Sequence, residues 1–144
     1  MSEPIILERH VGASAPVVFS YLTESSRWSR WQGVSATIEG HPGGIFAVTM
    51  PNGSMVQGQF IEVDPDRRVV FSWGWVDHQE LPPGSSTVEI ELIPDAGGTL
   101  IRLTHRGLPP DELEIHTAGW NRYLPRLGLA AEGGQPEPDT VPSA

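Results

Sequence analysis

The sequence predicts an α+β domain in which an antiparallel sheet of about seven strands packs against one long C-terminal helix. Two observations carry this prediction. A long helical pattern occurs only near the C-terminus, in residues 109–128, whereas from Val34 onward apolar and polar residues alternate and turn clusters recur about every ten residues. The sheet formed by this alternating region is the one broad apolar surface that the helix can cover.

The final helix is expected from Pro109 to Gly128. Asp111 and Glu114 resemble a capping box at its start, Gly128 offers a left-handed stop, and Pro125 is expected to bend or end it on its outer side. Its buried stripe, within about a third of the circumference, consists of Leu113, His116, Trp120, Tyr123, Leu124 and Leu127.

Before the sheet region, an extended run from Ile5 to Val11 predicts the first strand. Ser14 followed by Pro16 then predicts the start of a short helix. A second short helix is expected over residues 25–31, where two tryptophans lie three residues apart on one face.

Six further strands are bounded by clusters of Gly, Pro, Asn and Asp. They are expected at Val34–Glu39, Gly44–Met50, Ser54–Val63, Val69–Val76, Ser86–Ile93 and Thr99–Arg106. Alternation places one set of side chains on the inner face of the sheet. This set comprises Phe46, Val48, Met50, Val56, Gly58, Phe60, Val69, Phe71, Trp73, Trp75, Val88, Ile90, Leu92, Ile101, Leu103 and His105.

Composition excludes several classes of protein. The 144 residues suit one domain, with no cysteines for disulfides or thiolate chemistry and a formal net charge of −9. An acidic chain repels nucleic acids and anionic membranes, so we expect no nucleic-acid or membrane partner. No stretch of the sequence is long and apolar enough to be an export signal or to span a membrane, so we expect a cytoplasmic protein. We expect the domain to occupy residues 1–130 and residues 131–144 to form a flexible tail, to which we assign no function.

Several long segments resemble the START-like (SRPBCC) superfamily, and within it the group similar to the activator of the heat-shock-protein-90 ATPase. They are PGGIFAVTMPNGSMVQGQFIEVDPDRRVVFSWGW, PPGSSTVEIELIPDAGGTLIRLTHRGLP, HTAGWNRYLPRL and the Trp-rich SRWSRW, which together cover nearly all of residues 4–130. The resemblance implies a helix-grip fold, in which a strongly curved sheet wraps the last helix and a cavity is enclosed between the helix and the sheet. It also implies a hydrophobic ligand or, in a minority of members, cyclisation and related reactions. The co-chaperone that names the group has a further N-terminal domain with no counterpart in this sequence.

Two histidines are the candidate catalytic residues. His105 is expected on the inner face of the last strand and His116 on the inner stripe of the final helix, so they can face each other as an acid and base pair. The alternative, which the sequence favours, is that each is a buried polar residue with its hydrogen bonds satisfied. No spacing of histidines or acids indicates a metal site, and no cofactor motif is present in the sequence.

The sequence therefore favours binding of a small hydrophobic or amphipathic molecule. The residues expected to line the cavity are Trp28, Phe46, Met50, Phe60, Trp73, Trp75, His105, His116, Trp120 and Tyr123. Gly119, in the middle of the helix, suggests close approach of a strand or of the ligand. The alternatives are an enzyme of the cyclase or hydratase kind that uses the two histidines, and a protein-interaction module, which includes a possible homodimer.

Overall fold

The computed structural model describes residues 3–140. Its elements follow the predicted order: β1 (Ile5–Val11), α1 (Ala15–Thr23), α2 (Ser25–Trp28), β2 (Ser35–Ile38), β3 (Ile45–Thr49), β4 (Met55–Asp64), β5 (Arg68–Trp73), β6 (Ser86–Asp95), β7 (Gly98–Arg106) and α3 (Pro110–Ala131). All strand pairs are antiparallel, in the order β1-β7-β6-β5-β4-β3-β2. The predicted α+β class and the seven-stranded sheet are confirmed.

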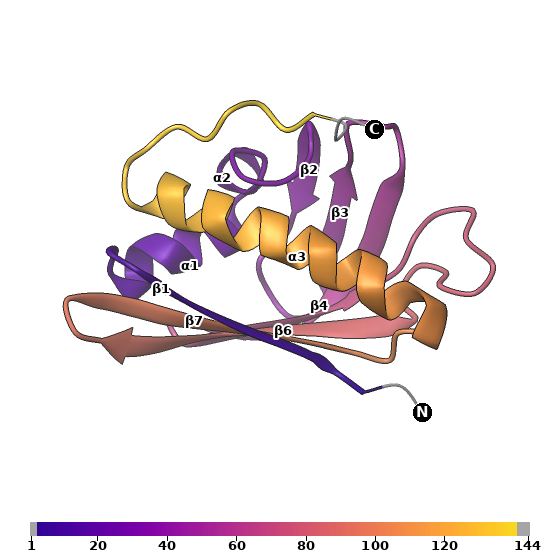
Figure 1. The fold of residues 1–144 in the computed structure, drawn as a ribbon, viewed down its shortest axis with the longest axis horizontal. Coiled ribbons are helices and arrows are strands. Elements are labelled where there is room, and N and C mark those ends of the chain that lie inside the picture. The colour runs from indigo at the N-terminus through magenta and orange to yellow at the C-terminus, as the bar shows by residue number, and fades with distance from the viewer. Residues whose placement is uncertain (1–2, 141–144) are drawn as a thin grey trace.

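The sheet curves around α3. Figure 1 shows β1, β7 and β6 running beneath the helix while β2, β3 and β4 stand up behind it, with α1 and α2 against one end. The inner face of the sheet is buried as the alternation predicted, apart from Gly58 and Trp75, which are half-buried. Trp28 and Trp31 are both fully buried, with ring centroids 4.6 Å apart. None of the helices within residues 3–140 is long and apolar enough to cross a membrane.

Most strand ends differ from the prediction by one or two residues, but β5 ends at Trp73 rather than Val76. The loop after β5 folds back onto it, because Trp75 N–H donates to the Leu81 carbonyl at 2.8 Å. Gly74 permits this return, since a Cβ there would collide with the Pro82 carbonyl. Trp75 is therefore at the end of the sheet rather than within a strand.

The helix boundaries also need correction. The second helix is only four residues long, Ser25–Trp28. Neither Ser14 before α1 nor the predicted capping box at α3 makes a side-chain cap hydrogen bond. Pro125 does not end α3, and Gly128 lies inside it rather than stopping it. Gly128 instead allows close packing on β1, because a Cβ there would lie 2.8 Å from Val11 Cγ1.

Candidate functional site

A cavity of about 570 Å³ lies between α3 and the end of the sheet where β5 leaves it. Six residues of α3 line one wall: Glu112, Ile115, His116, Gly119, Trp120 and Tyr123. The opposite wall and the rim come from the sheet end and the loops around it, through Met50, Pro51, Asn52, Ser54, Trp73, Trp75, Val76, Asp77 and His78, and Gln32 and Thr140 complete the lining. This volume is in the range that small organic ligands occupy in proteins.

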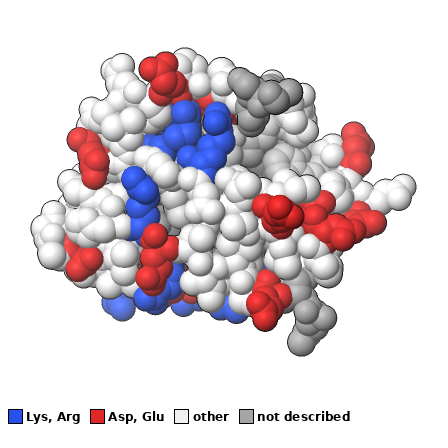
Figure 2. All heavy atoms as spheres, in the orientation of Figure 1, with Lys and Arg blue, Asp and Glu red and all other residues white. Residues whose placement is uncertain are grey.

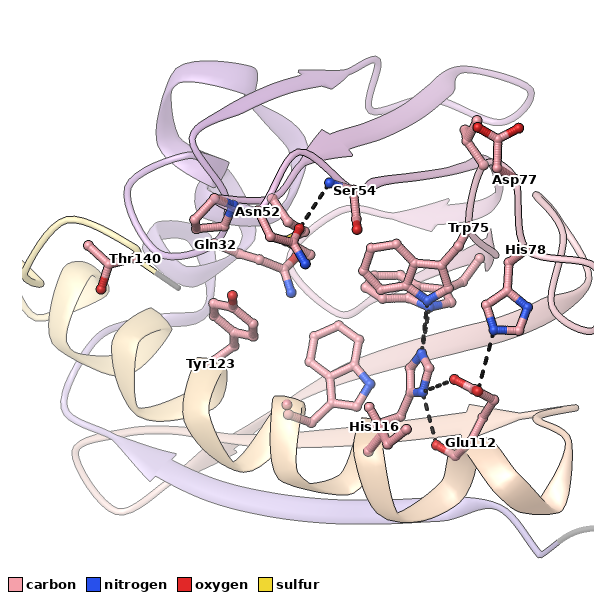
Figure 3. Close-up of a pocket in the computed structure, with 17 residues that line it drawn as sticks. Gln32, Asn52, Ser54, Trp75, Asp77, His78, Glu112, His116, Tyr123 and Thr140 are labelled. Carbon is pink, nitrogen blue, oxygen red and sulfur yellow. Dashed lines mark hydrogen bonds and ion pairs between the residues drawn. The ribbon is translucent and has the colours of Figure 1, made fainter. Parts of the chain in front are cut away.

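His116 holds two of the cavity's indole rings in place (Figure 3). The Nε1–H groups of Trp73 and Trp75 donate to His116 Nε2 at 3.3 and 3.1 Å. Since an indole N–H is only a donor, Nε2 carries no proton and the proton is on Nδ1, which donates to the Glu112 carbonyl at 2.9 Å. His116 is therefore a neutral acceptor for two tryptophans.

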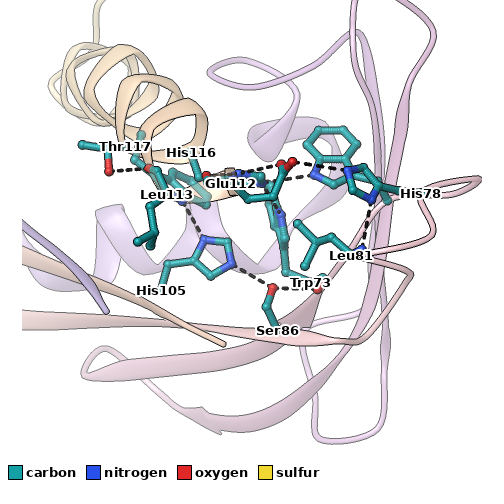
Figure 4. Close-up of polar contacts among 11 residues, drawn as sticks. Trp73, His78, Leu81, Ser86, His105, Glu112, Leu113, His116 and Thr117 are labelled. Carbon is teal, nitrogen blue, oxygen red and sulfur yellow. Dashed lines mark hydrogen bonds and ion pairs between the residues drawn. The ribbon is translucent and has the colours of Figure 1, made fainter. Parts of the chain in front are cut away.

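The Glu112 carboxylate lies between two imidazoles. Its Oε1 is 3.5 Å from His116 Nδ1, and its Oε2 is 3.4 Å from His78 Nε2. His78 Nδ1 accepts a hydrogen bond from Leu81 N–H at 2.9 Å, so its Nε2 is the nitrogen that faces Glu112. These contacts tie the β5–β6 loop to the first turn of α3 (Figure 4).

His105 is held by a separate chain of hydrogen bonds (Figure 4). Trp120 Nε1–H donates to His105 Nδ1 at 3.0 Å, so the imidazole proton is on Nε2. Nε2 lies 2.9 Å from Ser86 Oγ, and the Ser86 hydroxyl in turn donates to the Trp73 carbonyl at 2.8 Å. Every polar atom of this buried chain therefore has a partner, as burial requires.

Burial keeps both imidazoles neutral. Loss of solvation, with a smaller contribution from His116, lowers the pKa of His105 to about 3. Burial likewise lowers the pKa of His116, and the hydrogen bond to the Glu112 carbonyl and the Glu112 charge oppose this only in part. The two rings do face each other, with centroids 5.4 Å apart, but all four ring nitrogens are occupied by protein groups. This geometry fits the buried structural alternative better than an acid and base pair.

Six of the ten residues expected at the cavity line it, and four do not. The six are Met50, Trp73, Trp75, His116, Trp120 and Tyr123. Trp28, Phe46 and Phe60 lie in the aromatic core behind the cavity, where Phe46 stacks on Phe71 at 4.2 Å. His105 is also fully buried, behind the lining residues Trp73, His116 and Trp120, whose rings it contacts. Alternation identifies the inner face of a sheet, but it does not tell which part of that face the helix leaves uncovered.

The polar lining could not be predicted from the sequence pattern, because it comes from loops and from the tail. Gln32, Asn52, Ser54, Asp77 and Thr140 lie outside the helices and strands and have no periodicity that would reveal them. Glu112 had a usable signal, because it lies four residues before His116 and therefore on the same face of α3. Gly119 faces open space, with nothing within 4 Å of a Cβ built there, so the expected approach of a strand is wrong.

The segment after α3 closes one end of the site through Asp139, which is only 7% exposed. Its carboxylate accepts hydrogen bonds from Gly33 N–H and the Tyr123 hydroxyl, both at 2.8 Å, and pairs with Arg122 at 2.9 Å. Burial, with the Asp139 carboxylate second, raises the pKa of Tyr123 to about 12. Asp139 of the predicted tail therefore contacts the domain, while residues 141–144 of that tail lie outside the described part of the chain. The boundary of the domain at residue 130 and the flexibility of the tail stay predictions.

No group of three His, Asp or Glu side chains between residues 3 and 140 is arranged to hold a metal ion.

The curved sheet that grips a C-terminal helix around a cavity defines a START-like domain. The family model described as "Activator of Hsp90 ATPase homolog 1-like protein" matches residues 12–132, and the chain belongs to that family. An AHSA1-like protein of Rhizobium etli is 41% identical, with a TM-score of 0.73 over 100% of this chain and 92% of that one.

Other relatives are more distant. CalU16 of Micromonospora echinospora is 27% identical, with a TM-score of 0.72 over 89% of this chain and 75% of that one. The Aha1 dimer of Colwellia psychrerythraea shares the fold at 18% identity, with a TM-score of 0.82 over 94% of this chain and 100% of that one. The human "Activator of 90 kDa heat shock protein ATPase homolog 1" is 32% identical over 89 residues, which are 61% of this chain and 25% of that protein. The match thus spans about a quarter of the human relative.

Proposed function

We propose that this protein binds a small hydrophobic or amphipathic molecule in the cavity between α3 and the sheet. The observation that carries the proposal is the cavity itself: about 570 Å³, bounded by the rings of Trp73, Trp75 and Trp120. A cavity that merely reflected poor packing would not need its indoles fixed. Here each of the three donates its N–H to a buried imidazole, so the rings are held in one arrangement before any ligand arrives.

The first test is native mass spectrometry of the purified protein, followed by denaturing extraction of whatever is bound. Retention of a stoichiometric small molecule supports the proposal and supplies its chemical class. A purified protein that carries no small molecule and binds no apolar dye would speak against the proposal.

Gly119 offers a sharper test, because it lines the cavity and faces open space. A Phe side chain at this position would occupy the cavity, whereas Ala would fill little of it. We expect Gly119→Phe to abolish binding of an apolar dye and Gly119→Ala to leave it within about twofold. Equal binding by both variants, with far-ultraviolet spectra unchanged, would place the dye elsewhere and refute the proposal.

Catalysis by His105 and His116 is the weaker alternative. General acid and base catalysis needs a nitrogen that reaches the substrate, and the protein's own groups occupy all of theirs. If the pair catalysed a reaction, His105→Ala and His116→Ala would abolish turnover of the extracted molecule while leaving its affinity largely intact.

A further inference from the structure

One side chain at the cavity directs a hydrogen-bond donor into it. Gln32 is 1% exposed, and its Oε1 accepts the indole N–H of Trp28 at 3.0 Å. Because an indole nitrogen can only donate, this contact fixes which end of the amide is oxygen and directs Nε2 into the cavity (Figure 3). Within residues 3–140 the amide makes its hydrogen bond through Oε1, and Nε2 is not among the buried side-chain atoms that lack a partner. The donor therefore opens onto the cavity, where it can donate a hydrogen bond to an acceptor on a ligand.

A second amide lies beside it. Asn52 Oδ1 accepts the Ser54 N–H at 2.9 Å, which leaves Asn52 Nδ2 as the free end of that amide. Figure 3 shows the Gln32 and Asn52 side chains at one end of the cavity, while Glu112, His78 and Asp77 are at the other and Trp75 lies between them. The cavity therefore has a donor end and an acidic end.

The charges around the cavity do not suit an anion. Its lining includes the carboxylates of Asp77 and Glu112 but no arginine, and the sequence contains no lysine. Acidic side chains gather where α3 begins and the β5–β6 loop projects, whereas basic ones cluster farther along α3 (Figure 2). The nearby Arg122 is already paired with Asp139. A carboxylate or phosphate would enter a cavity whose lining offers no arginine to pair with it and includes two carboxylates.

The indoles of the lining offer their rings but not their N–H groups. Trp73 and Trp75 donate to His116, and Trp120 donates to His105. Trp73 and Trp120 have ring centroids 5.1 Å apart and planes inclined by 48°, so they form two adjoining aromatic surfaces. Either ring face favours contact with a flat apolar group of a ligand, and the specific hydrogen bond must come from the amide end.

We propose that Gln32 recognises the ligand by donating a hydrogen bond from Nε2 to an uncharged oxygen, so that the ligand is a flat, neutral molecule bearing a carbonyl group. This inference rests on the proposed function, because it assigns the ligand class of the same cavity.

Three probes that share one ring system test the inference: 2-acetylnaphthalene, 2-isopropenylnaphthalene, in which CH₂ replaces the carbonyl oxygen, and 2-naphthoate. We expect calorimetry at pH 7.5 to show that the wild-type protein binds the ketone about fivefold to tenfold more tightly than the alkene, as one neutral hydrogen bond implies. We expect 2-naphthoate to bind most weakly. In ¹H–¹⁵N spectra, the Gln32 side-chain amide should shift with the ketone but not with the alkene.

The matched variants are Gln32→Glu and Gln59→Glu. The first keeps an acceptor for Trp28 but replaces the donor that faces the cavity, while the second makes the same change on the exposed surface of β4. We expect the preference for the ketone to fall below about twofold in Gln32→Glu and to persist in Gln59→Glu. The Trp28 indole resonance reports whether Gln32→Glu is folded, and the wild-type amide shift tests the inference without any variant.

The outcomes separate the inference from the proposed function. If the alkene and the ketone bind equally, if the preference survives in a folded Gln32→Glu, or if 2-naphthoate binds best, the inference is wrong while cavity binding stands. If none of the probes binds and Gly119→Phe changes no dye binding, both the proposed function and the inference fail.

Discussion

The neutral state of His105 gives this protein a predictable dependence of stability on pH. His105 is fully buried, and its pKa is lowered from 6.5 to about 3 in the folded state. Below pH 6.5 the unfolded chain therefore binds a proton that the folded protein does not, so the contribution is fully present above pH 6.5 and is lost as the pH falls towards 3. Each pH unit in this range removes about 1.4 kcal/mol, about 5 kcal/mol in total.

The comparison that isolates this effect is His105→Gln, which does not titrate but retains an acceptor for Trp120 and a donor for Ser86. Urea unfolding followed by tryptophan fluorescence should be measured from pH 8 to pH 5. We expect the wild-type free energy of unfolding to fall by about 2 kcal/mol more than that of the variant over this interval. His41→Gln, on an exposed turn where the ring contacts only the neighbouring Pro42 carbonyl, serves as the control and should follow the wild-type curve.

Parallel curves for the wild type and His105→Gln would refute the reasoning. Nitrogen-detected spectra of the wild-type imidazole provide a direct check that needs no variant. They should show the proton on Nε2 throughout this range, because Trp120 occupies Nδ1. A ring that gains a second proton near pH 6.5 would contradict the neutral network.

Three further predictions concern stability. His116→Leu should lower the free energy of unfolding by about 2 to 5 kcal/mol, because it leaves the indole N–H groups of Trp73 and Trp75 without an acceptor; a loss below about 1 kcal/mol in urea unfolding would show that the hydrogen bonds are unimportant. Asp139→Asn should cost about 1 to 2 kcal/mol, since its partner Arg122 is partly exposed, and should speed proteolysis after α3. Burial alone would raise the pKa of Asp139, but the hydrogen bonds from Arg122 and Gly33 outweigh it and lower this pKa overall. The stabilisation by the Asp139 carboxylate is therefore present above the pKa of this group in the unfolded chain and is lost as the pH falls through its pKa in the folded protein. Unchanged proteolysis of Asp139→Asn would contradict a stabilising role for Asp139. Gly119→Ala should raise the free energy of unfolding by about 0.5 to 1 kcal/mol, because alanine has the higher helix propensity. Gly128→Ala should lower it, because the added Cβ would collide with Val11 of β1. A change in stability of the same sign for both variants in thermal unfolding would contradict these roles of the two glycines.

Sequence reasoning recovered the fold because the relevant signals are local. The alternation in Val88, Ile90 and Leu92 placed a strand face, and the stripe from His116 to Leu127 placed the helix face, from chemistry within a few residues. The error at the C-terminal end of α3 has an identifiable cause. Gly128 has the residue type of a helix stop, but packing against Val11 keeps it helical, and a local pattern contains no information about that distant strand.

For the candidate site, too, part could be predicted from local sequence patterns and part could not. By itself the sequence determined that His116 and Trp73 face a common interior, because period and alternation fix which side of an element a residue occupies. Only the tertiary structure decided that the indoles donate to the imidazoles, that Gln32 directs the donor end of its amide into the cavity and that Asp139 closes one end of the site. These contacts join residues that are up to 106 positions apart in the chain, and they depend on how the elements meet in space rather than on any local pattern.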